Sequence, residues 1–386
     1  MRFSERLKKI PPYLFVEIDR KIEEKKSQGV DVISFGVGDP DMPSPEKVIA
    51  TLCRESKNPL NHRYPSYFGL PEFRSAASEW IEKRFSVHLD PEREILPLLG
   101  SKEGIAHFAL AVLDPGDVAL ICEPGYPVYE IGALLAGAEP FSLPLTRENE
   151  FLPDLDSIPG EILKRSKILW LNYPNNPTGA VANREFFEMA VRFAQENDII
   201  LAHDNAYSEI TYDGFIAPSV MEIEGARNVA IEFHSLSKSF NMTGWRIGFA
   251  IGNERIIESL ASIKTNVDSG IFNPIQLAGI TALLEEAETI QRMRNVYAKR
   301  REFLVREFLE LGWNVTPPKG SIYIWLPVPR GFDSISFSKD VLDRAGVFFT
   351  PGNVYGPSGE GYVRVSLTVP DERIELAIER LKEAFK

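Results

Sequence analysis

The sequence predicts an α/β protein built on a mainly parallel sheet, with a second, smaller α+β domain. Three observations lead to this prediction. The chain has 386 residues, which is more than one small hydrophobic core usually contains. Its middle part alternates short apolar runs with longer amphipathic ones, as strand–helix units do. After about residue 280 this alternation gives way to a long charged helix pattern followed by short strand-like runs.

The individual elements follow from the same patterns. Strands are expected at the apolar runs and helices at the amphipathic stretches between them. In the middle of the chain these strands are Val118–Cys122, Ile168–Leu171, Ile199–Ala202, Val229–Phe233 and Ile247–Ile251, and the helices are Ser101–Leu113 and Arg184–Asn197. Later we expect one helix over about Ala282–Leu311 and strands at Ser321–Leu326, Val347–Thr350 and Tyr362–Ser366. This gives a large domain over residues 38–279 and a small domain made of residues 1–37 and 280–386.

Composition and charge argue against several classes of protein. The net charge of −12 disfavours a nucleic-acid-binding surface, which needs clustered Lys and Arg. Cys53 and Cys122 belong to no CxxC or Cys/His cluster, so we expect neither a disulfide framework nor a metal site, and Cys122 should be a buried thiol. The polar N-terminus resembles no signal peptide, and no apolar run approaches the ~18 residues of a membrane span. We therefore expect a cytoplasmic protein.

Polar side chains follow four of the predicted strands. The segments are Glu123–Tyr126, Asn172–Asn176, His203–Asn205 and His234–Lys238. In an open parallel sheet, ligands bind outside the carboxyl ends of the strands. The four segments are therefore expected to meet at one crevice, which would contain an aromatic ring, amides, a carboxylate, hydroxyls and an amine.

Lys238 and Asp204 are the candidates for chemistry in this crevice. Burial would lower the pKa of Lys238, and a neutral amine can form a Schiff base with a carbonyl. An exposed lysine in a Ser-rich turn explains the local sequence equally well. Asp204 could pair with a protonated pyridine nitrogen, or it could simply cap a helix.

An anion could be bound between Arg246 and the helix that begins at Ser101. A guanidinium can hold a phosphate by two hydrogen bonds, and a helix N-terminus offers free N–H groups. Gly244 and Gly248 allow the backbone to turn closely beside Arg246. A plain Ser cap is the alternative for Ser101 alone, but Arg246 and Ser235 together with it favour a phosphate site.

Each of the remaining candidate residues could have a purely structural role instead of a ligand-binding one. Asn176 and Tyr207 could hydrogen-bond an oxygen on a flat ring, and Tyr126 could stack on that ring, but all three could also be turn or core residues. Arg364 lies inside an apolar strand-like run and would suit a substrate carboxylate if it points inward. An outward-facing strand position is the other possibility.

In this order, these residues resemble the class I/II aminotransferases of the pyridoxal-phosphate (PLP) fold-type I superfamily. The resemblance covers nearly the whole chain and is carried by Asn176-Pro177-Thr178-Gly179, Asp204-Asn205-Ala206-Tyr207, Ser235-Leu236-Ser237-Lys238 and Gly244-Trp245-Arg246-Ile247-Gly248. It implies a mainly parallel seven-stranded sheet in the large domain. It also implies that PLP is held covalently by Lys238 and that an amino group passes between an amino acid and a 2-oxo acid by a ping-pong mechanism.

The resemblance also implies roles for individual residues. Catalysis would depend on Lys238, Asp204 and Tyr207. The cofactor would be held by Ser101, Lys102, Tyr126, Asn176, Asp204, Tyr207, Ser235, Ser237, Lys238 and Arg246. Members of the family are homodimers with shared sites, and Tyr64 looks like the tyrosine lent to the neighbour's phosphate. Arg364 would bind the substrate α-carboxylate, with Gly38 beside it.

A narrower resemblance is to the LL-diaminopimelate aminotransferases of lysine biosynthesis, with 2-oxoglutarate as the acceptor. It is carried by the stretches Leu96–His107, Asn241–Arg246 and Asp268–Phe272. It implies substrate contacts from Tyr13, Gly38, Lys102, Tyr126, Asn176 and Arg364, and from Asn273 across the dimer. Plant-type members place a glutamate shortly after the tyrosine matching Tyr64 to hold the distal amine, whereas here Pro65, Ser66 and Tyr67 follow. Aspartate, alanine or aromatic substrates therefore remain open.

Three other functions are weighed against this one. A C–S β-lyase would share the fold and cofactor site. A regulatory module that binds PLP as an effector would usually carry a DNA-binding segment, and the sequence shows no basic helix-turn-helix candidate. A nucleotide-binding enzyme is disfavoured because there is no GxxxxGK[ST] run, and Gly36-Val37-Gly38 lacks the third glycine of a dinucleotide-binding loop.

Overall fold

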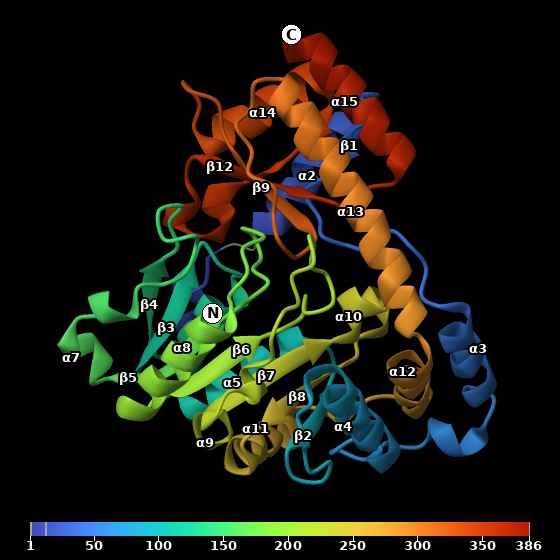
Figure 1. Cartoon of the computed structure of the whole chain (residues 1–386), viewed down its shortest axis with the longest axis vertical. Coiled ribbons are helices and arrows are strands. Elements are labelled where there is room, and N and C mark those ends of the chain that lie inside the picture. Colours follow the sequence, from blue (N-terminus) through green and yellow to red (C-terminus); the bar gives the residue numbers. More distant parts are fainter. Residues whose placement is uncertain (1, 12–13, 386) are drawn as a thin grey trace.

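The computed structural model describes residues 2–11 and 14–385 and has a seven-stranded sheet at its centre (Figure 1). The strands lie in the order β2-β8-β7-β6-β5-β3-β4, and β8 alone runs opposite to its neighbours. The fold is therefore α/β with a mainly parallel sheet, as predicted. The strands within the described residues are β1 Ile33–Ser34, β2 Ile95–Leu98, β3 Val118–Glu123, β4 Glu139–Pro144, β5 Ser166–Leu171, β6 Ile200–Asp204, β7 Ala230–Ser235, β8 Gly248–Gly252, β9 Tyr323–Pro327, β10 Val347–Phe348, β11 Thr350–Pro351 and β12 Tyr362–Ser366.

Helices flank the sheet and form much of the remaining chain (Figure 1). The α-helices are α1 Arg6–Lys9, α2 Leu14–Ser27, α3 Glu46–Glu55, α4 Pro71–Phe85, α5 Ser101–Val112, α6 Val128–Ala136, α7 Gly160–Leu163, α8 Arg184–Glu196, α9 Ala226–Val229, α10 Leu236–Ser239, α11 Glu254–Val267, α12 Asn273–Glu285, α13 Ala287–Glu310, α14 Ser334–Ala345 and α15 Asp371–Phe385. Short 3-10 turns are η1 Pro59–His62, η2 Leu155–Ser157, η3 Val220–Glu222, η4 Thr243–Trp245, η5 Gly352–Tyr355 and η6 Pro357–Gly359.

The central sheet is covered on both faces. In β3, Val118 and Leu120 pack into a core shared with α4, α8 and α12, whereas Ala119 and Ile121 pack into a second core with α5, α6 and α11. Successive side chains of a strand point to opposite faces, so a strand buried on both faces must be apolar throughout. This explains why the central strands appear in the sequence as continuous apolar runs.

A second layer of structure lies beyond the carboxyl ends of the large sheet (Figure 1). It contains the antiparallel sheet β11-β12-β9 and the parallel pair β1-β10, with their own apolar core against α13, α14 and α15. The segment before residue 37 joins this layer, because β1 pairs with β10 and Asp31 binds Arg373 and Arg380. The domain limits at residues 37/38 and 279/280 remain a prediction, and the second of them falls within α12.

Several predicted elements were wrong in their limits by one or two residues or more, and three of them show why. The helix expected over Ala282–Leu311 is two helices, because Glu286 leaves helical geometry (φ −113°, ψ 30°) and accepts a hydrogen bond from the Thr289 hydroxyl instead. The run Val347–Thr350 is divided between β10 and β11, which belong to different sheets. The strand expected from Val229 begins at Ala230, since Val229 ends the short helix α9.

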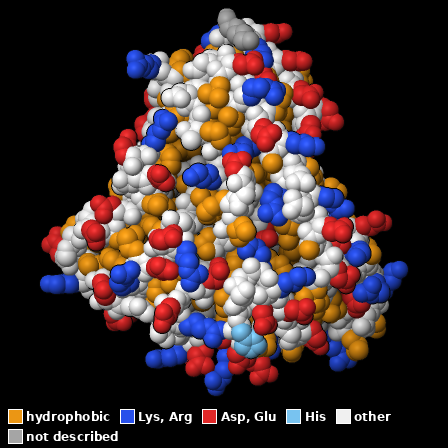
Figure 2. Space-filling view, viewed as in Figure 1, with side chains coloured by type: hydrophobic (Ala, Val, Ile, Leu, Met, Phe, Trp, Pro, Cys, Tyr) orange, Lys and Arg blue, Asp and Glu red, His pale blue; other side chains and the backbone are white. Residues whose placement is uncertain are grey.

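The surface carries acidic and basic side chains interspersed, and neither sign gathers into a large patch on the face shown in Figure 2. Cys122 is a buried thiol, as expected, and burial raises its pKa to about 12. Within the described residues, no helix is both long and apolar enough to cross a membrane.

Candidate active site

A cavity of about 370 Å³ opens at the carboxyl ends of β5, β6 and β7, beneath the second layer. The segments that follow β3, β5, β6 and β7 all contribute to it, as the sequence predicts. Its lining includes the predicted residues Gly38, Ser101, Lys102, Tyr126, Asn176, Asp204, Tyr207, Ser235, Ser237, Lys238, Arg246 and Arg364. Six further residues complete it, namely Val37, Asp39, Asn172, Ala206, Thr243 and Tyr323.

Lys238 lies in the one-turn helix α10, directly after β7. The hydroxyl of Ser235 accepts a hydrogen bond from the Ser237 amide at 3.2 Å and so caps this turn. The Lys238 amine lines the cavity and donates to the Gly38 carbonyl at 2.6 Å. Burial lowers the pKa of this amine, which favours its neutral, nucleophilic form. The alternative of an exposed lysine in a Ser-rich turn is wrong.

Asp204 ends β6 at the floor of the cavity and is only 5% exposed. Its Oδ2 accepts a hydrogen bond from the Tyr129 hydroxyl at 2.8 Å. Its Oδ1 is buried and accepts none from the described residues. Burial raises the pKa of Asp204, while the Tyr129 hydrogen bond and the nearby His203 act in the opposite direction. A buried acceptor without a donor is costly, so this oxygen suits a ligand that brings an N–H group.

Arg364 points inward from β12 and is 3% exposed, so the outward-facing alternative is wrong. Its guanidinium donates to the Asn176 Oδ1 at 2.9 Å and to the Gly36 carbonyl at 2.6 Å. The same group lies 4.0 Å from the centre of the Tyr323 ring. A buried cation whose planar face rests on an aromatic ring is well placed to receive a carboxylate.

The start of α5 and Arg246 form a cradle for an anion. A Cβ at Gly100 would lie 2.3 Å from the Arg246 Nη2, so only glycine lets the guanidinium approach this helix end. A Cβ at Gly248 would likewise lie 2.6 Å from the His234 carbonyl oxygen and 3.1 Å from the Ser101 amide nitrogen. The free N–H groups of a helix N-terminus and a guanidinium together favour a phosphate.

Two important tyrosines were missed in the sequence. Tyr129 lies one helical turn after Tyr126, and this spacing was the only signal that it would face the same site. Tyr323 comes from β9, and its hydroxyl lies 3.3 Å from that of Tyr207. A Cβ at Gly38 would lie 1.9 Å from the Tyr323 hydroxyl oxygen, so the glycine at this position makes room for the phenol.

Two predicted site residues in the described part of the chain are not among those that line this cavity. Tyr64 lies on the surface and is 86% exposed. Asn273 begins α12 and lies near the Gln276 amide. Tyr13 lies outside the described residues.

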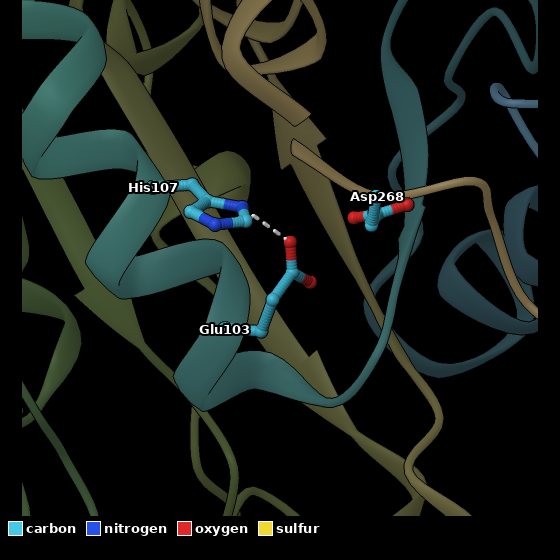
Figure 3. Close-up of side chains that lie close together, drawn as sticks. All are labelled: Glu103, His107 and Asp268. Atoms are coloured by element: carbon cyan, nitrogen blue, oxygen red, sulfur yellow. Dashed lines mark ion pairs between the residues drawn. The ribbon is translucent and has the colours of Figure 1, made fainter. Parts of the chain in front are cut away.

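A second cluster of ionisable side chains lies between α5, which carries Glu103 and His107, and Asp268, the residue after α11 (Figure 3). Ligand atoms of Glu103, His107 and Asp268 are within 4.8 Å of one another, and His107 pairs with Glu103 at 2.6 Å. The Asp268 carboxylate, however, already accepts two hydrogen bonds from the buried Lys264 ammonium, at 2.6 and 2.7 Å. A divalent cation would be repelled by this ammonium, so we assign no metal to the cluster.

Comparison with known proteins agrees with this geometry. The family model for aminotransferase class I and II matches residues 30–381. An LL-diaminopimelate aminotransferase from Dehalococcoides mccartyi is 54% identical over 381 residues, which cover 99% of this chain and 98% of that protein. A protein of the same name from Moorella thermoacetica is 53% identical over 385 residues, covering 100% of this chain and 99% of its own.

Solved structures share the fold as well. The substrate-bound structure of BacF from Bacillus subtilis superimposes with a TM-score of 0.95 at 35% identity, covering 99% of this chain and 98% of that one. The buried acceptor of Asp204, the anion cradle and the amine of Lys238 fit the pyridine nitrogen, phosphate and aldehyde of PLP. The chain therefore belongs to the class I and II aminotransferases, which are PLP-dependent enzymes.

Proposed function

We propose that this enzyme transfers an amino group from LL-diaminopimelate to 2-oxoglutarate. The assignment of this substrate rests on the match, over the full chain, to relatives named LL-diaminopimelate aminotransferase at 53–54% identity. The narrower sequence resemblance points the same way. We also propose a cytoplasmic location, in keeping with the two free cysteines.

The residues of the cavity divide into groups that would hold the parts of PLP. Asp204 would accept the pyridine N–H, and Tyr126 would lie against the ring. Asn176 and Tyr207 would bind the ring oxygen. The N-terminus of α5, with Ser101 and Lys102, would bind the phosphate together with Ser235, Ser237 and Arg246. When bound, PLP supplies an aldehyde that reacts with amines and a ring that accepts electrons.

The chain's own groups then have distinct tasks. The neutral amine of Lys238 can take the proton from the substrate's α-carbon as a general base and return it as a general acid. Arg364 would hold the α-carboxylate and so fix the substrate's orientation. The Gly38 carbonyl, which accepts from Lys238, would hold the amine near the site of proton transfer.

We further propose that the enzyme is a homodimer. Large apolar side chains stand exposed on η1, on the loop that follows it, at the end of α11 and on the loop that follows α11, namely Leu60, Tyr64, Phe68, Val267 and Phe272. The His62 and Phe272 rings are 6.1 Å apart, and Gly270 packs against Ser66, so the two loops form one surface. Exposed apolar surface of this kind is typical of an interface, and Tyr64 would reach the partner's phosphate from it.

The substrate test is an absorbance spectrum followed by addition of LL-diaminopimelate and 2-oxoglutarate. We expect a visible cofactor band that bleaches with diaminopimelate, and glutamate as a product. Bleaching only with aspartate, alanine or an aromatic amino acid would overturn the substrate but keep the reaction. Release of ammonia without an oxo-acid acceptor would indicate a β-lyase, and a band without any turnover would indicate a regulatory module.

A further inference from the structure

A network of buried ionisable side chains lies on the face of the sheet opposite to Asp204. His203 on β6 and Glu232 on β7 are both 0% exposed. The Glu232 carboxylate makes hydrogen bonds with the His203 Nδ1 at 2.8 Å and the His234 Nε2 at 2.7 Å. It also accepts from the Ser219 hydroxyl and the Val220 amide, each at 2.8 Å. Catalysis as described above uses none of these groups.

The bonding of His203 determines how many protons its ring carries. Its Nε2 lies 3.0 Å from the Tyr173 carbonyl oxygen, and a carbonyl can only accept, so Nε2 must carry a proton. Its Nδ1 faces the Glu232 carboxylate. If that carboxylate is ionised, it too can only accept, and Nδ1 must also carry a proton.

The surroundings of Glu232 indicate that its carboxylate is ionised. Three donors besides His203 point at its two oxygens, and donors favour the charged form. Burial alone would raise the pKa of Glu232, but the hydrogen bonds from His203 and His234 hold it well below its usual range. His234 uses only Nε2 toward Glu232, so it needs one proton and no charge. One cation and one anion then leave the buried network neutral, as burial requires.

The position of His203 connects this network to the residues of the active-site cavity. Its neighbour in β6 is Asp204, and its Nε2 binds the residue that starts the Tyr173–Asn176 loop, which carries the cofactor residue Asn176. Its partner Glu232 lies three residues before Ser235 in β7. The network therefore joins the ends of β5, β6 and β7 on which Asn176, Asp204 and Lys238 depend.

We propose that His203 is a buried imidazolium, paired with Glu232, that positions these three strand ends and stabilises the ionised form of Asp204. The inference rests on the proposed function in that Asp204 is taken to face the PLP nitrogen. A positive charge one residue away opposes the neutralisation that burial would impose on this carboxylate. His203 is thus a positioning residue that acts through Asp204 and does not touch the cofactor.

The protonation state can be read by NMR on the PLP-loaded enzyme with ¹⁵N-labelled histidine. The chain has only five histidines, so the ring N–H signals can be assigned by single substitutions. At pH 8, where solvent-exposed histidine is neutral, we expect two slowly exchanging ring N–H signals that disappear together in His203→Gln. In Glu232→Gln the compensating charge is gone, and one of the two signals should be lost. A single N–H signal from His203 in the unmodified enzyme would overturn the imidazolium.

The positioning role is tested by cofactor affinity, measured from the visible band during PLP titration. His203→Gln should weaken PLP binding about tenfold or more, by analogy with metal sites, where loss of a residue that orients a ligand commonly has an effect of this size. His234→Gln is the matched control, because it removes a donor from the same carboxylate but no charge, and it should weaken binding much less. Equal losses in both variants, or a loss of thermal stability with unchanged PLP affinity in His203→Gln, would overturn the role.

The results of these experiments can contradict the inference about His203 without contradicting the proposed function, and the reverse also holds. A chain that shows no cofactor band in its unmodified form would overturn the proposed chemistry, whatever the state of His203. A chain that binds PLP but prefers another amino acid would leave both the NMR and the affinity results as tests of this inference.

Discussion

At the scale of single residues, burial determines which groups can act. Lys238 and Asp204 lie in the same cavity, yet burial favours the neutral form of each, so the amine gains reactivity and the carboxylate must be kept charged by its neighbours. Tyr129 and the network behind β6 supply that support. The reactive groups therefore depend on residues that never meet the substrate.

We expect Lys238→Ala to lose at least about a thousandfold in turnover, because a positioned general base contributes on this order. The measurement is the rate of glutamate formation with saturating PLP. Lys167→Ala is the matched control, since Lys167 is an exposed lysine near the start of β5, at the end of that strand away from the cavity, and should be replaceable without loss. Turnover near that of the unmodified enzyme in Lys238→Ala would refute the mechanism.

Glu232 should make the stability of the folded enzyme depend on pH in the acid range. Its pKa is lowered in the folded chain, so its stabilising contribution is complete above its unfolded pKa, near 4.5, and is lost as the pH falls below that value. The unmodified enzyme should therefore be more stable than Glu232→Gln at pH 6, with the difference shrinking as the pH falls toward 3. Urea unfolding followed by fluorescence at each pH measures this difference. A constant difference across this range would contradict the lowered pKa.

Sequence could predict residues of the site that follow strands, and it missed those whose position depends on tertiary contacts. Asp204 and Lys238 were found because the ends of parallel strands meet at one edge. Tyr129 appears in the sequence as one more apolar residue of a helix. Tyr323 reaches the site only because β9 packs over Tyr207, and nothing near residue 323 in the sequence signals that contact.

At the scale of elements, α13 anchors a loop that lines the cavity. Arg300 is nearly buried in this helix and donates to both carboxylate oxygens of Asp41, at 2.7 and 2.9 Å, as well as to Asp371 in α15. Asp41 follows the segment that contains Gly38 and Asp39. The clamp thus connects the long helix of the second layer to the place where the substrate carboxylate would bind.

Arg300→Lys should raise KM for the amino acid about tenfold with a smaller change in kcat. A lysine cannot reproduce the two parallel hydrogen bonds, so the loop would lose its fixed position, and binding would weaken in ground state and transition state alike. Arg301→Lys is the matched control, because Arg301 makes the same kind of fork with Asp213, and neither of these residues lines the cavity. Steady-state kinetics of both variants give the test, and equal effects would show that only helix stability was changed.

The observed limits of the helices and strands show what sequence patterns can predict and what they cannot. Alternation and apolar runs located β3, β5 and β12 and the helices α5 and α8 to within a few residues. The break between α12 and α13 was missed because Glu286 is a good helix former, and only its local contact with Thr289 ends the pattern. Such a break is a property of packing, which periodicity does not record.

At the scale of the whole molecule, two predicted site residues do not line the cavity of their own chain. Tyr64 stands exposed among other large apolar side chains, while Lys238 and Arg364 share one cavity within the same chain. A homodimer in which Tyr64 serves the neighbour's site would account for both facts. In that arrangement each site needs Lys238 from one subunit and Tyr64 from the other.

Mixing two impaired variants tests this arrangement. Lys238→Ala and Tyr64→Ala should each be impaired alone, but a mixed dimer would contain one site with both an intact Lys238 and the partner's intact Tyr64. Unfolding, mixing and refolding the two variants with PLP should therefore restore a measurable share of activity, with light scattering confirming a dimer.

The matched control for this experiment is Lys238→Ala mixed with Arg364→Ala. Both residues belong to the same site, so no mixed dimer can assemble an intact one, and activity should stay low. If the Tyr64 pair also fails to recover while the mixed dimer forms, Tyr64 acts within its own subunit or not at all. If the chain is monomeric at the assay concentration, the exposed apolar surface around Tyr64 has another purpose and the shared site is excluded.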